Sequence, residues 1–171
     1  AQVAAYLDKS QLRPVLQEYM GKIEGEVGKI FDDSENPMLV KIVISSNLAI
    51  AQYPVLHNYG LTEGTVPGFV TYVGEDFGHH EVLFLIRGML EIEERLAELE
   101  GRGKDQTKIK GMIEKVSTEL DSDLSAKDYE KAVDKYRPFL HSDFFADAYT
   151  QLEVSLKRIS KMLELDELVD D

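Results

Sequence analysis

The feature that most limits the possible folds of this chain is the spacing of its apolar residues. Between Glu81 and Glu100 these residues form a heptad seam: Val82, Leu85, Met89, Ile92, Leu96 and Leu99. Steps of three and four place side chains on one face of an α-helix, whereas a half-buried strand needs alternation. No segment shows a strand pattern of matching strength, and residues 66–73 are predicted to be a loop or a short helix. The chain is therefore predicted to be all-α.

Further helices are predicted from the same spacing together with capping residues. They cover residues 10–31, 37–53, 109–120 and 125–136, and a last helix is predicted to begin at a cap on Ser142. The break at Gly101-Arg102-Gly103 is short enough to make the helices on either side an antiparallel helical hairpin. Residues 164–171 form an acidic tail that is predicted to fray.

The segment 38–53 stands out because it carries one charge, Lys41, and is apolar around nearly its whole circumference. Asn36 and Pro37 would serve as its N-cap and first helical residue. Such a segment is typical of a helix enclosed by others. The predicted architecture is a single domain over residues 1–171, a helical bundle of five to six helices with one buried central helix.

Composition narrows the possible partners and compartments. The 171 residues contain no cysteine and carry a net charge of −13, which opposes binding to nucleic acid and to anionic membranes. No apolar run is long enough to cross a bilayer. We expect a soluble, cytoplasmic protein; because the chain begins at Ala1, a fragment and a mature exported protein are left open.

Residues 53–80 are the stretch that does not resemble an amphipathic helix. This segment is rich in glycine and aromatic residues and holds three of the four histidines. Its composition is typical of a loop that borders a binding pocket. The predicted ligand-binding residues are His57, Tyr59, Tyr72, His79 and His80. We expect the segment to act as a lid or binding loop.

Asp76, His79 and His80 have the chemistry of metal ligands, since imidazole and carboxylate suit several transition metals. The paired Glu-x-x-His motifs of di-iron bundles are missing, because Gly78 stands three residues after Glu75. Asp76 is explained as well by capping a helix that begins near Phe77. No cofactor is predicted, and a metal at these residues is kept as the alternative.

Gly21, Gly25 and Gly28 fall on one face of the predicted first helix. Glycine inside a helix costs roughly 1 kcal/mol relative to alanine, so a stripe of three needs compensation. We interpret the stripe as a place of close helix packing, either within the chain or across a dimer. A loosely wound, partly exposed helix is the alternative.

Two charged features could engage other molecules. Arg137 and His141 lie near the bend at Pro138, a combination found in helical ribonucleases, but the negative charge of the chain opposes an RNA substrate. A cluster of glutamates occupies the outward faces of the heptad helix and could bind a basic protein partner. Its members are Glu91, Glu93, Glu94, Glu98 and Glu100.

No recognisable catalytic motif occurs in the sequence. The favoured hypothesis is a non-enzymatic helical interaction or regulatory module that engages a protein partner. Because Ile86 and Leu90 add apolar surface beside the main seam, the module is predicted to be a homodimer. The alternative is a small-molecule- or metal-binding bundle with a pocket under the 53–80 segment. An enzyme that uses one of the segment's histidines as a general base is the third possibility.

Overall fold

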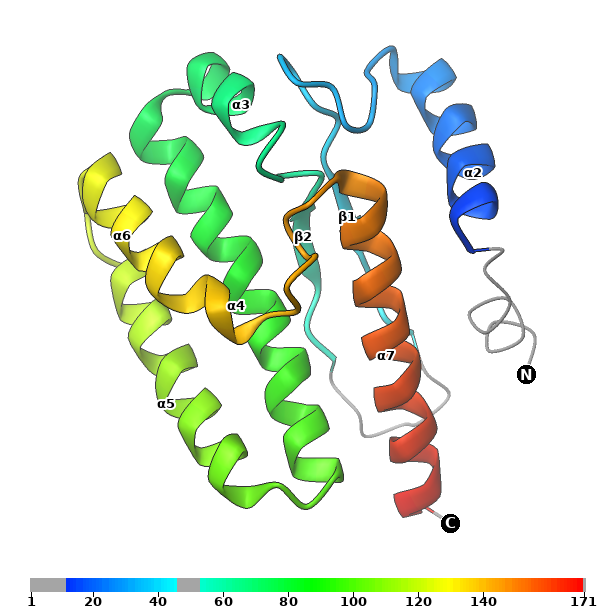
Figure 1. Cartoon of the computed structure of the whole chain (residues 1–171), viewed down its shortest axis with the longest axis vertical. Helices are drawn as coiled ribbons and strands as arrows, with labels where there is room; N and C mark the ends of the chain where they lie inside the picture. Colours follow the sequence, from blue (N-terminus) through cyan, green and yellow to red (C-terminus); the bar gives the residue numbers. More distant parts are fainter. Residues whose placement is uncertain (1–11, 46–52, 171) are drawn as a thin grey trace.

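The computed structural model describes residues 12–45 and 53–170. In these residues the protein is mostly helical, which confirms the predicted all-α class (Figure 1). The helices are α2 (Leu12–Val27), α3 (Val66–Val73), α4 (Glu75–Leu99), α5 (Gly103–Leu120), α6 (Ala126–Tyr136) and α7 (Ala148–Asp170). A 3₁₀ turn, η1 (Arg137–Phe139), follows α6, and two short strands, β1 (Val40–Ile42) and β2 (Leu56–Tyr59), complete the fold.

Helix α4 is the centre of the molecule. It contacts α3, α5, α6, α7 and β2. The predicted heptad residues Val82, Leu85 and Met89 are buried, and so are Ile86 and Leu90. The second apolar stripe is therefore covered by the chain itself, which removes the structural argument for a homodimer.

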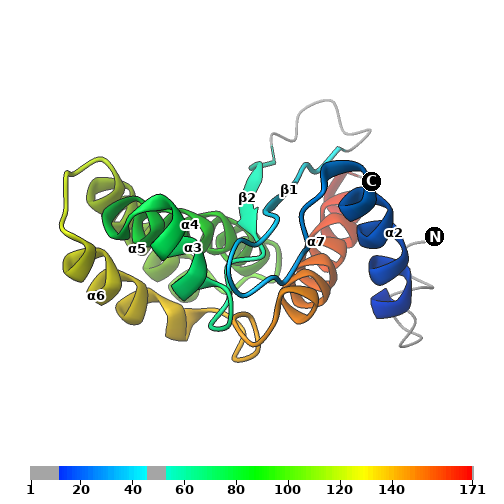
Figure 2. The same cartoon turned by 90° about the horizontal axis from the view of Figure 1, so that it is seen from above.

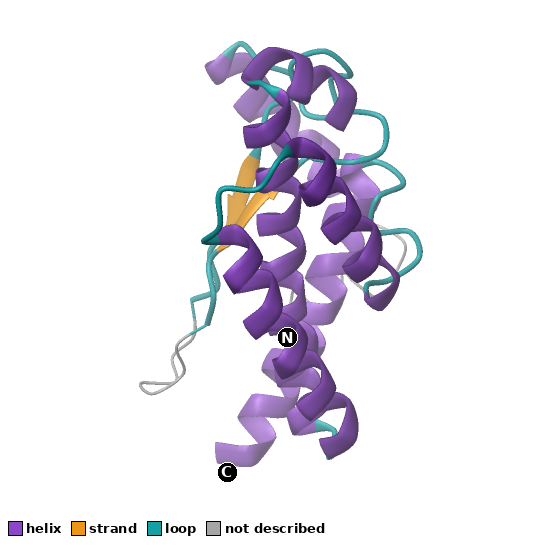
Figure 3. Cartoon of the chain, turned by 90° about the vertical axis from the view of Figure 1, so that its left-hand side faces the viewer, coloured by secondary structure: helices purple, strands orange, loops and turns teal. Residues whose placement is uncertain are grey.

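The predicted central helix over residues 37–53 is wrong. Residues 40–42 form a strand that pairs antiparallel with β2, in the register Val40 with Tyr59 and Ile42 with Leu56 (Figure 3). β-Branched residues at 40, 42, 43 and 44 favour extended backbone, and an apolar run of this kind does not distinguish a strand from a buried helix. Residues 46–52, the second half of the predicted helix, lie outside the described residues.

The helices are arranged on two sides of the small sheet. From above, α3, α4, α5 and α6 gather on one side of β1 and β2, with α7 and α2 on the other (Figure 2). Helix α2 packs against α7. Arg13 on α2 forms an ion pair with Glu153 on α7, with Nη2 3.0 Å from Oε2.

The hairpin of α4 and α5 and the helix at 126–136 match the predictions. Ser125 caps α6, since its hydroxyl accepts a hydrogen bond from the backbone N–H of Asp128. The end of α6 at Tyr136, just before Pro138, also agrees with the prediction. The segment 66–73 is the short helix α3, one of the two predicted alternatives.

The predicted start of the last helix needs correction. Ser142 does not cap α7, because residues 142–146 form turns and the helix begins at Ala148. Asp147 accepts a hydrogen bond from the N–H of Thr150 at 2.9 Å and takes the capping role. At the other end of α7 the helix continues through the acidic segment to Asp170, and Asp166 is buried.

Candidate functional site

The five predicted ligand-binding residues do not converge on one pocket. Tyr59 is fully buried, and its hydroxyl donates a hydrogen bond to Sδ of Met89 at 2.9 Å. Burial raises the pKa of the Tyr59 hydroxyl above its ordinary value. Tyr72 is 67% exposed, with Nζ of Lys29 5.7 Å from its ring centre. Tyr59 is therefore part of the core and Tyr72 part of the surface.

The three histidines point to different surroundings. The His57 ring lies against Phe84, with the ring centres 5.4 Å apart. His79 borders a pocket between α3 and α6, whereas His80 borders a second pocket between α4 and α5. Residues of the 53–80 segment border two separate hollows beside the first half of α4: Thr62, Glu63, Val66, Pro67 and His79 line the first, and His80 lines the second.

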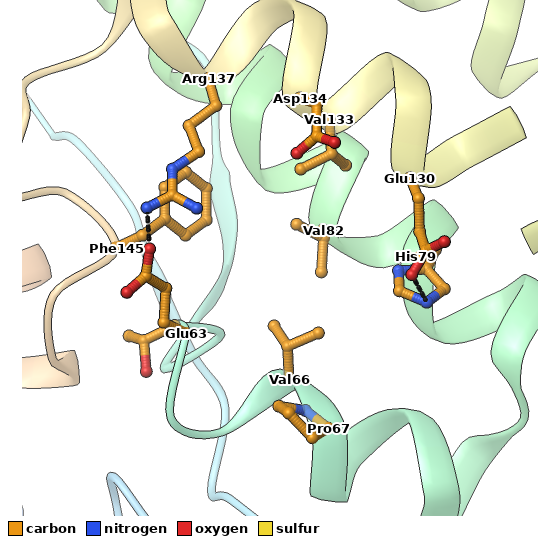
Figure 4. A pocket seen from close by; sticks show the side chains of 11 residues that line it. Glu63, Val66, Pro67, His79, Val82, Glu130, Val133, Asp134, Arg137 and Phe145 are labelled. Atoms are coloured by element: carbon orange, nitrogen blue, oxygen red, sulfur yellow. Dashed lines mark hydrogen bonds and ion pairs between the residues drawn. The ribbon is translucent and has the colours of Figure 1, made fainter. Parts of the chain in front are cut away.

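The first hollow, here named the Arg137 pocket, has a volume of about 350 Å³ (Figure 4). It lies where the turn before α3, helix α3, the first half of α4, helix α6 and the segment before α7 meet. Its lining residues are Thr62, Glu63, Val66, Pro67, His79, Val82, Glu130, Val133, Asp134, Arg137 and Phe145.

Arg137 is the positively charged group of this pocket. Its guanidinium forms an ion pair with Glu63 (Figure 4). The guanidinium carbon lies 5.0 Å from the centre of the Phe145 ring, within the range of a cation–π contact. Phe145 is buried, so it gives Arg137 a fixed surface to rest on. The side chains of Arg137 and Glu63 are 38% and 61% exposed, so water still reaches the pair.

Three carboxylates oppose this one guanidinium. Glu130 and Asp134 are one helical turn apart on α6, which brings both to the same face. Oε1 of Glu130 lies 3.3 Å from Nε2 of His79. With Glu63, the formal charge of the pocket is −2 when His79 is neutral. A free anion would therefore meet net repulsion here.

The turn from Gly60 to Thr65, which carries Glu63, is fixed by buried polar side chains. Gln151 of α7 accepts a hydrogen bond from the N–H of Gly60 and donates one to the carbonyl of Leu61, each at 2.8 Å. The hydroxyl of Thr65 accepts from the N–H of Thr62 at 2.9 Å. Gly60 has φ 112°, and a Cβ there would lie 2.9 Å from the carbonyl oxygen of Met38. The wall of the pocket that carries Glu63 is thus held in place by the hydrogen bonds of Gln151 and Thr65 and by the close approach of Met38 to Gly60.

Asp76, His79 and His80 do not form the proposed metal site in this structure. Oδ1 of Asp76 accepts a hydrogen bond from the N–H of Ala126 at 2.7 Å, so it links the starts of α4 and α6. It does not cap a helix at Phe77, because α4 begins at Glu75 after Gly74. In residues 12–45 and 53–170, no three histidine, aspartate or glutamate side chains are grouped closely enough to hold a metal ion.

The glycine stripe has no close neighbour in the part of the chain that the structure describes. A Cβ added at Gly21, Gly25 or Gly28 would meet no atom within 4 Å. Gly28 lies just after α2 with φ 72°, the left-handed conformation in which helices commonly end. Among the described residues, close packing against the stripe is therefore not found, and the alternative of a partly exposed helix fits α2 better.

The outward glutamates of α4 are largely matched within the chain. Arg158 forms an ion pair with Glu93, Arg95 with Glu98, and Lys161 with Glu100. These contacts do not test the prediction of a basic partner.

Sequence reasoning missed most of the Arg137 pocket. Arg137 was considered only together with His141, as a pair of the kind found in helical ribonucleases, and Glu63, Glu130 and Phe145 were not predicted to be site residues. The available signal was the i, i+4 pair of carboxylates on α6 followed by Arg137 at the helix end. Nothing in the sequence relates that helix to Glu63, which lies 74 positions away from Arg137.

No helix in the described ranges is both long and apolar enough to span a membrane.

Comparison with known proteins gives one strong relationship. The chain is 39% identical, along all of its 171 residues, to part of the pyruvate, phosphate dikinase of Treponema pallidum. The chain spans 19% of the length of that enzyme. No family model matches the chain, and no solved structure matches it.

This relationship overturns the favoured hypothesis from the sequence. A chain that is similar throughout to part of an enzyme is not described by a non-enzymatic interaction or regulatory module. The associated predictions of a protein-protein interaction role and of a homodimer lose their support with it. The error arose because the absence of a familiar catalytic motif was taken as evidence against catalysis, although catalytic groups need not be neighbours in sequence.

Proposed function

We propose that this protein takes part in phosphoryl transfer as a helical unit of an enzyme of the pyruvate, phosphate dikinase kind. The observation that carries the proposal is the 39% identity over the whole chain to part of such an enzyme. The name of that enzyme includes pyruvate and phosphate. We therefore propose pyruvate and phosphate as ligands of this chain.

Within this function, the Arg137 pocket binds a phosphate group. Arginine presents a planar fork of N–H donors that matches phosphate oxygens. Exposed ion pairs such as the one between Arg137 and Glu63 contribute only about 0–1 kcal/mol, so a ligand can replace Glu63 at small cost. Phe145 keeps the guanidinium in place during the exchange.

The carboxylates of the pocket favour phosphate that is accompanied by magnesium. A phosphate dianion alone would be repelled by Glu63, Glu130 and Asp134. Magnesium in phosphoryl-transfer sites is held by one or two carboxylates together with phosphate oxygens and water. Glu130 and Asp134 share a face of α6 and supply two such carboxylates. One arginine and two carboxylates thus suit a magnesium-bound phosphate better than a free one.

A binding experiment tests this assignment. Phosphate would be titrated into the chain with and without Mg²⁺ and followed by ³¹P and ¹⁵N NMR. We expect saturable binding only with Mg²⁺, and weakening of about tenfold in Arg137→Gln, since a hydrogen bond to a charged group contributes about 1.5–3 kcal/mol. Lys110→Gln is the control, because Lys110 is exposed on α5 and lines neither pocket. Equal binding by Arg137→Gln and the wild type would contradict the assignment.

An activity assay tests the function itself. This chain would replace the matching region of the Treponema pallidum enzyme, and the resulting enzyme would be incubated with pyruvate, phosphate, Mg²⁺ and a nucleoside triphosphate while ³¹P NMR follows phosphorylated pyruvate and the nucleotide products. The enzyme with the unchanged chain and the one with Lys110→Gln should form phosphorylated pyruvate, and the one with Arg137→Gln should form it at least about tenfold more slowly. Product formation at the same rate in all three proteins would remove Arg137 from the mechanism.

A further inference from the structure

The second hollow, here named the Arg87 pocket, lies between α4 and the end of α5 and has a volume of about 380 Å³. Three of its lining residues, His80, Phe84 and Arg87, follow one another at helical spacing on the same face of α4. Ser117, Leu120 and Asp121 border it from α5 and its C-cap. A cation, an imidazole, a hydroxyl and a carboxylate therefore surround two apolar side chains.

His80 is held in a defined orientation by a short chain of hydrogen bonds. Its Nδ1 lies 2.9 Å from Oε1 of Glu81. The other oxygen of Glu81 accepts from the side-chain amide of Asn58 at 2.7 Å, and the same amide also contacts the carbonyl of Glu81. Asn58 adopts φ 66°, a left-handed conformation that asparagine tolerates better than most residues. Because Nδ1 is occupied by Glu81, Nε2 is the ring nitrogen left for a ligand.

Arg87 is only partly matched by protein groups. Its Nη2 lies 3.1 Å from Oε1 of Glu91, and its side chain is 36% exposed. Its Nε is buried and has no hydrogen-bond acceptor in the described part of the chain. Buried donors without acceptors are rare in folded proteins because each one costs free energy. The guanidinium therefore has donors in excess of its protein acceptors.

We propose that the Arg87 pocket binds a small organic monocarboxylate. The carboxylate binds the guanidinium fork of Arg87, the imidazole of His80 and the hydroxyl of Ser117 supply further hydrogen bonds, and the carbon skeleton packs against Phe84 and Leu120. A monoanion is favoured over phosphate because Arg87 is the one guanidinium among the residues that line the pocket and already faces the carboxylates of Asp121 and Glu91, so a dianion would meet more repulsion than a monoanion. The assignment of a carboxylate rests on these contacts, and the choice of pyruvate as that carboxylate rests on the proposed function.

Calorimetric titration of the full chain with pyruvate tests the inference, with neutral pyruvamide as the matched ligand that lacks only the carboxylate. We expect saturable binding of pyruvate and none of pyruvamide. Arg87→Gln should weaken pyruvate binding by at least about tenfold, and Lys110→Gln, which removes the same charge from α5, should leave it unchanged. Glu91→Gln should tighten binding, because it removes the carboxylate that competes for Arg87.

Several results would overturn the inference. They are an absence of saturable pyruvate binding, equal binding by Arg87→Gln, equal binding of pyruvamide, and phosphate binding that depends on Arg87 as strongly as pyruvate binding does. If circular dichroism shows that Arg87→Gln is unfolded, Arg87→Lys and Glu91→Gln decide: binding must weaken in the first and tighten in the second. Failure here leaves the role of Arg137 in phosphate binding intact, and pyruvate binding at Arg87 would persist even in a chain without phosphoryl-transfer activity.

Discussion

At the scale of single residues, the structure depends on polar side chains that lie on otherwise apolar helix faces. Helix α7 buries Gln151 and Asp166 alongside Leu152 and Ile159. Gln151 holds the turn that carries Glu63, and Asp166 joins the end of α7 to the rest of the molecule. Buried polar groups of this kind are stable only when they are hydrogen-bonded.

Asp166 gives the first prediction. It forms an ion pair with Arg95 of α4 and accepts a hydrogen bond from the hydroxyl of Tyr53 at 2.9 Å. Asp166→Asn should lower the free energy of unfolding by about 2 kcal/mol. This is less than the 3–5 kcal/mol typical of a fully buried pair, because Arg95 is 39% exposed and can turn to water.

Urea denaturation measures this change, with Glu167→Gln as the control at an exposed neighbouring position, where we expect a change within about 0.5 kcal/mol. Equal midpoints for Asp166→Asn and the wild type would show that the end of α7 is not held by this residue.

The second prediction concerns the pH dependence at Asp147. Partial burial alone would raise the pKa of Asp147, but hydrogen bonds from Thr150 and the charge of Arg13 outweigh it and hold this pKa below its ordinary value of 3.8. A lowered pKa in the folded state stabilises the protein above 3.8, and this contribution disappears as the pH falls through the folded-state value.

Asp147→Asn should therefore be less stable than the wild type at neutral pH by about 1 kcal/mol or less. The difference should shrink at pH values below 3.8. Denaturation curves for both proteins across this range measure it, and a difference that is constant with pH would contradict the charge of Asp147 as its cause.

At the scale of elements, glycines of similar appearance in the sequence have opposite roles. Gly25 in α2 has open space around it, whereas a Cβ at Gly78 in α4 would lie 2.7 Å from Cγ2 and 3.0 Å from Cα of Val70 in α3. The second contact is with backbone and cannot move aside easily. Gly78 is thus the glycine that permits two helices to approach closely.

The third prediction compares alanine at these two positions. Gly25→Ala should stabilise the protein by about 1 kcal/mol through helix propensity. Gly78→Ala should destabilise the protein by about 1–2 kcal/mol, because the cost of overpacking against Val70 is larger than the gain in helix propensity. Thermal unfolding of both variants gives the comparison. If Gly78→Ala proved more stable than Gly25→Ala, α3 would not cross α4 at Gly78.

Elements with a clear amphipathic period could be predicted from the sequence, and the others could not. The hairpin of α4 and α5 and the capped helix α6 were predicted because their apolar spacing and their Gly, Ser and Pro boundaries agree. The strand β1 was missed because its apolar residues fit both the three-to-four-residue spacing of a helix and the alternation of a strand. The start of α7 was missed because Ser142 and Asp147 are both capable caps, and long-range contacts favour a start at Asp147: Asp32 accepts a hydrogen bond from the N–H of Ala148, and Arg13 forms an ion pair with Asp147.

At the scale of the whole molecule, α4 places two different pockets side by side. His79 turns to the Arg137 pocket and the adjacent His80 to the Arg87 pocket. The sequence correctly indicated the histidines at 79 and 80 as residues to follow, but it joined them in one site. It indicated the short helix at 66–73 as one alternative and a helix start near Phe77, but it could not show that residues 56–59 become β2, because this strand depends on its long-range pairing with residues 40–42.

The central claim is that this chain performs the work of the matching part of a pyruvate, phosphate dikinase. The most direct measurement is the activity of a chimera in which this chain replaces the matching region of the Treponema pallidum enzyme. Our account predicts that the chimera converts pyruvate at a rate within about tenfold of the parent enzyme, and that Arg137→Gln in the chimera lowers this rate by at least about tenfold further. A chimera that is folded, as judged by circular dichroism and by a cooperative unfolding transition, and yet forms no phosphorylated pyruvate would contradict the claim.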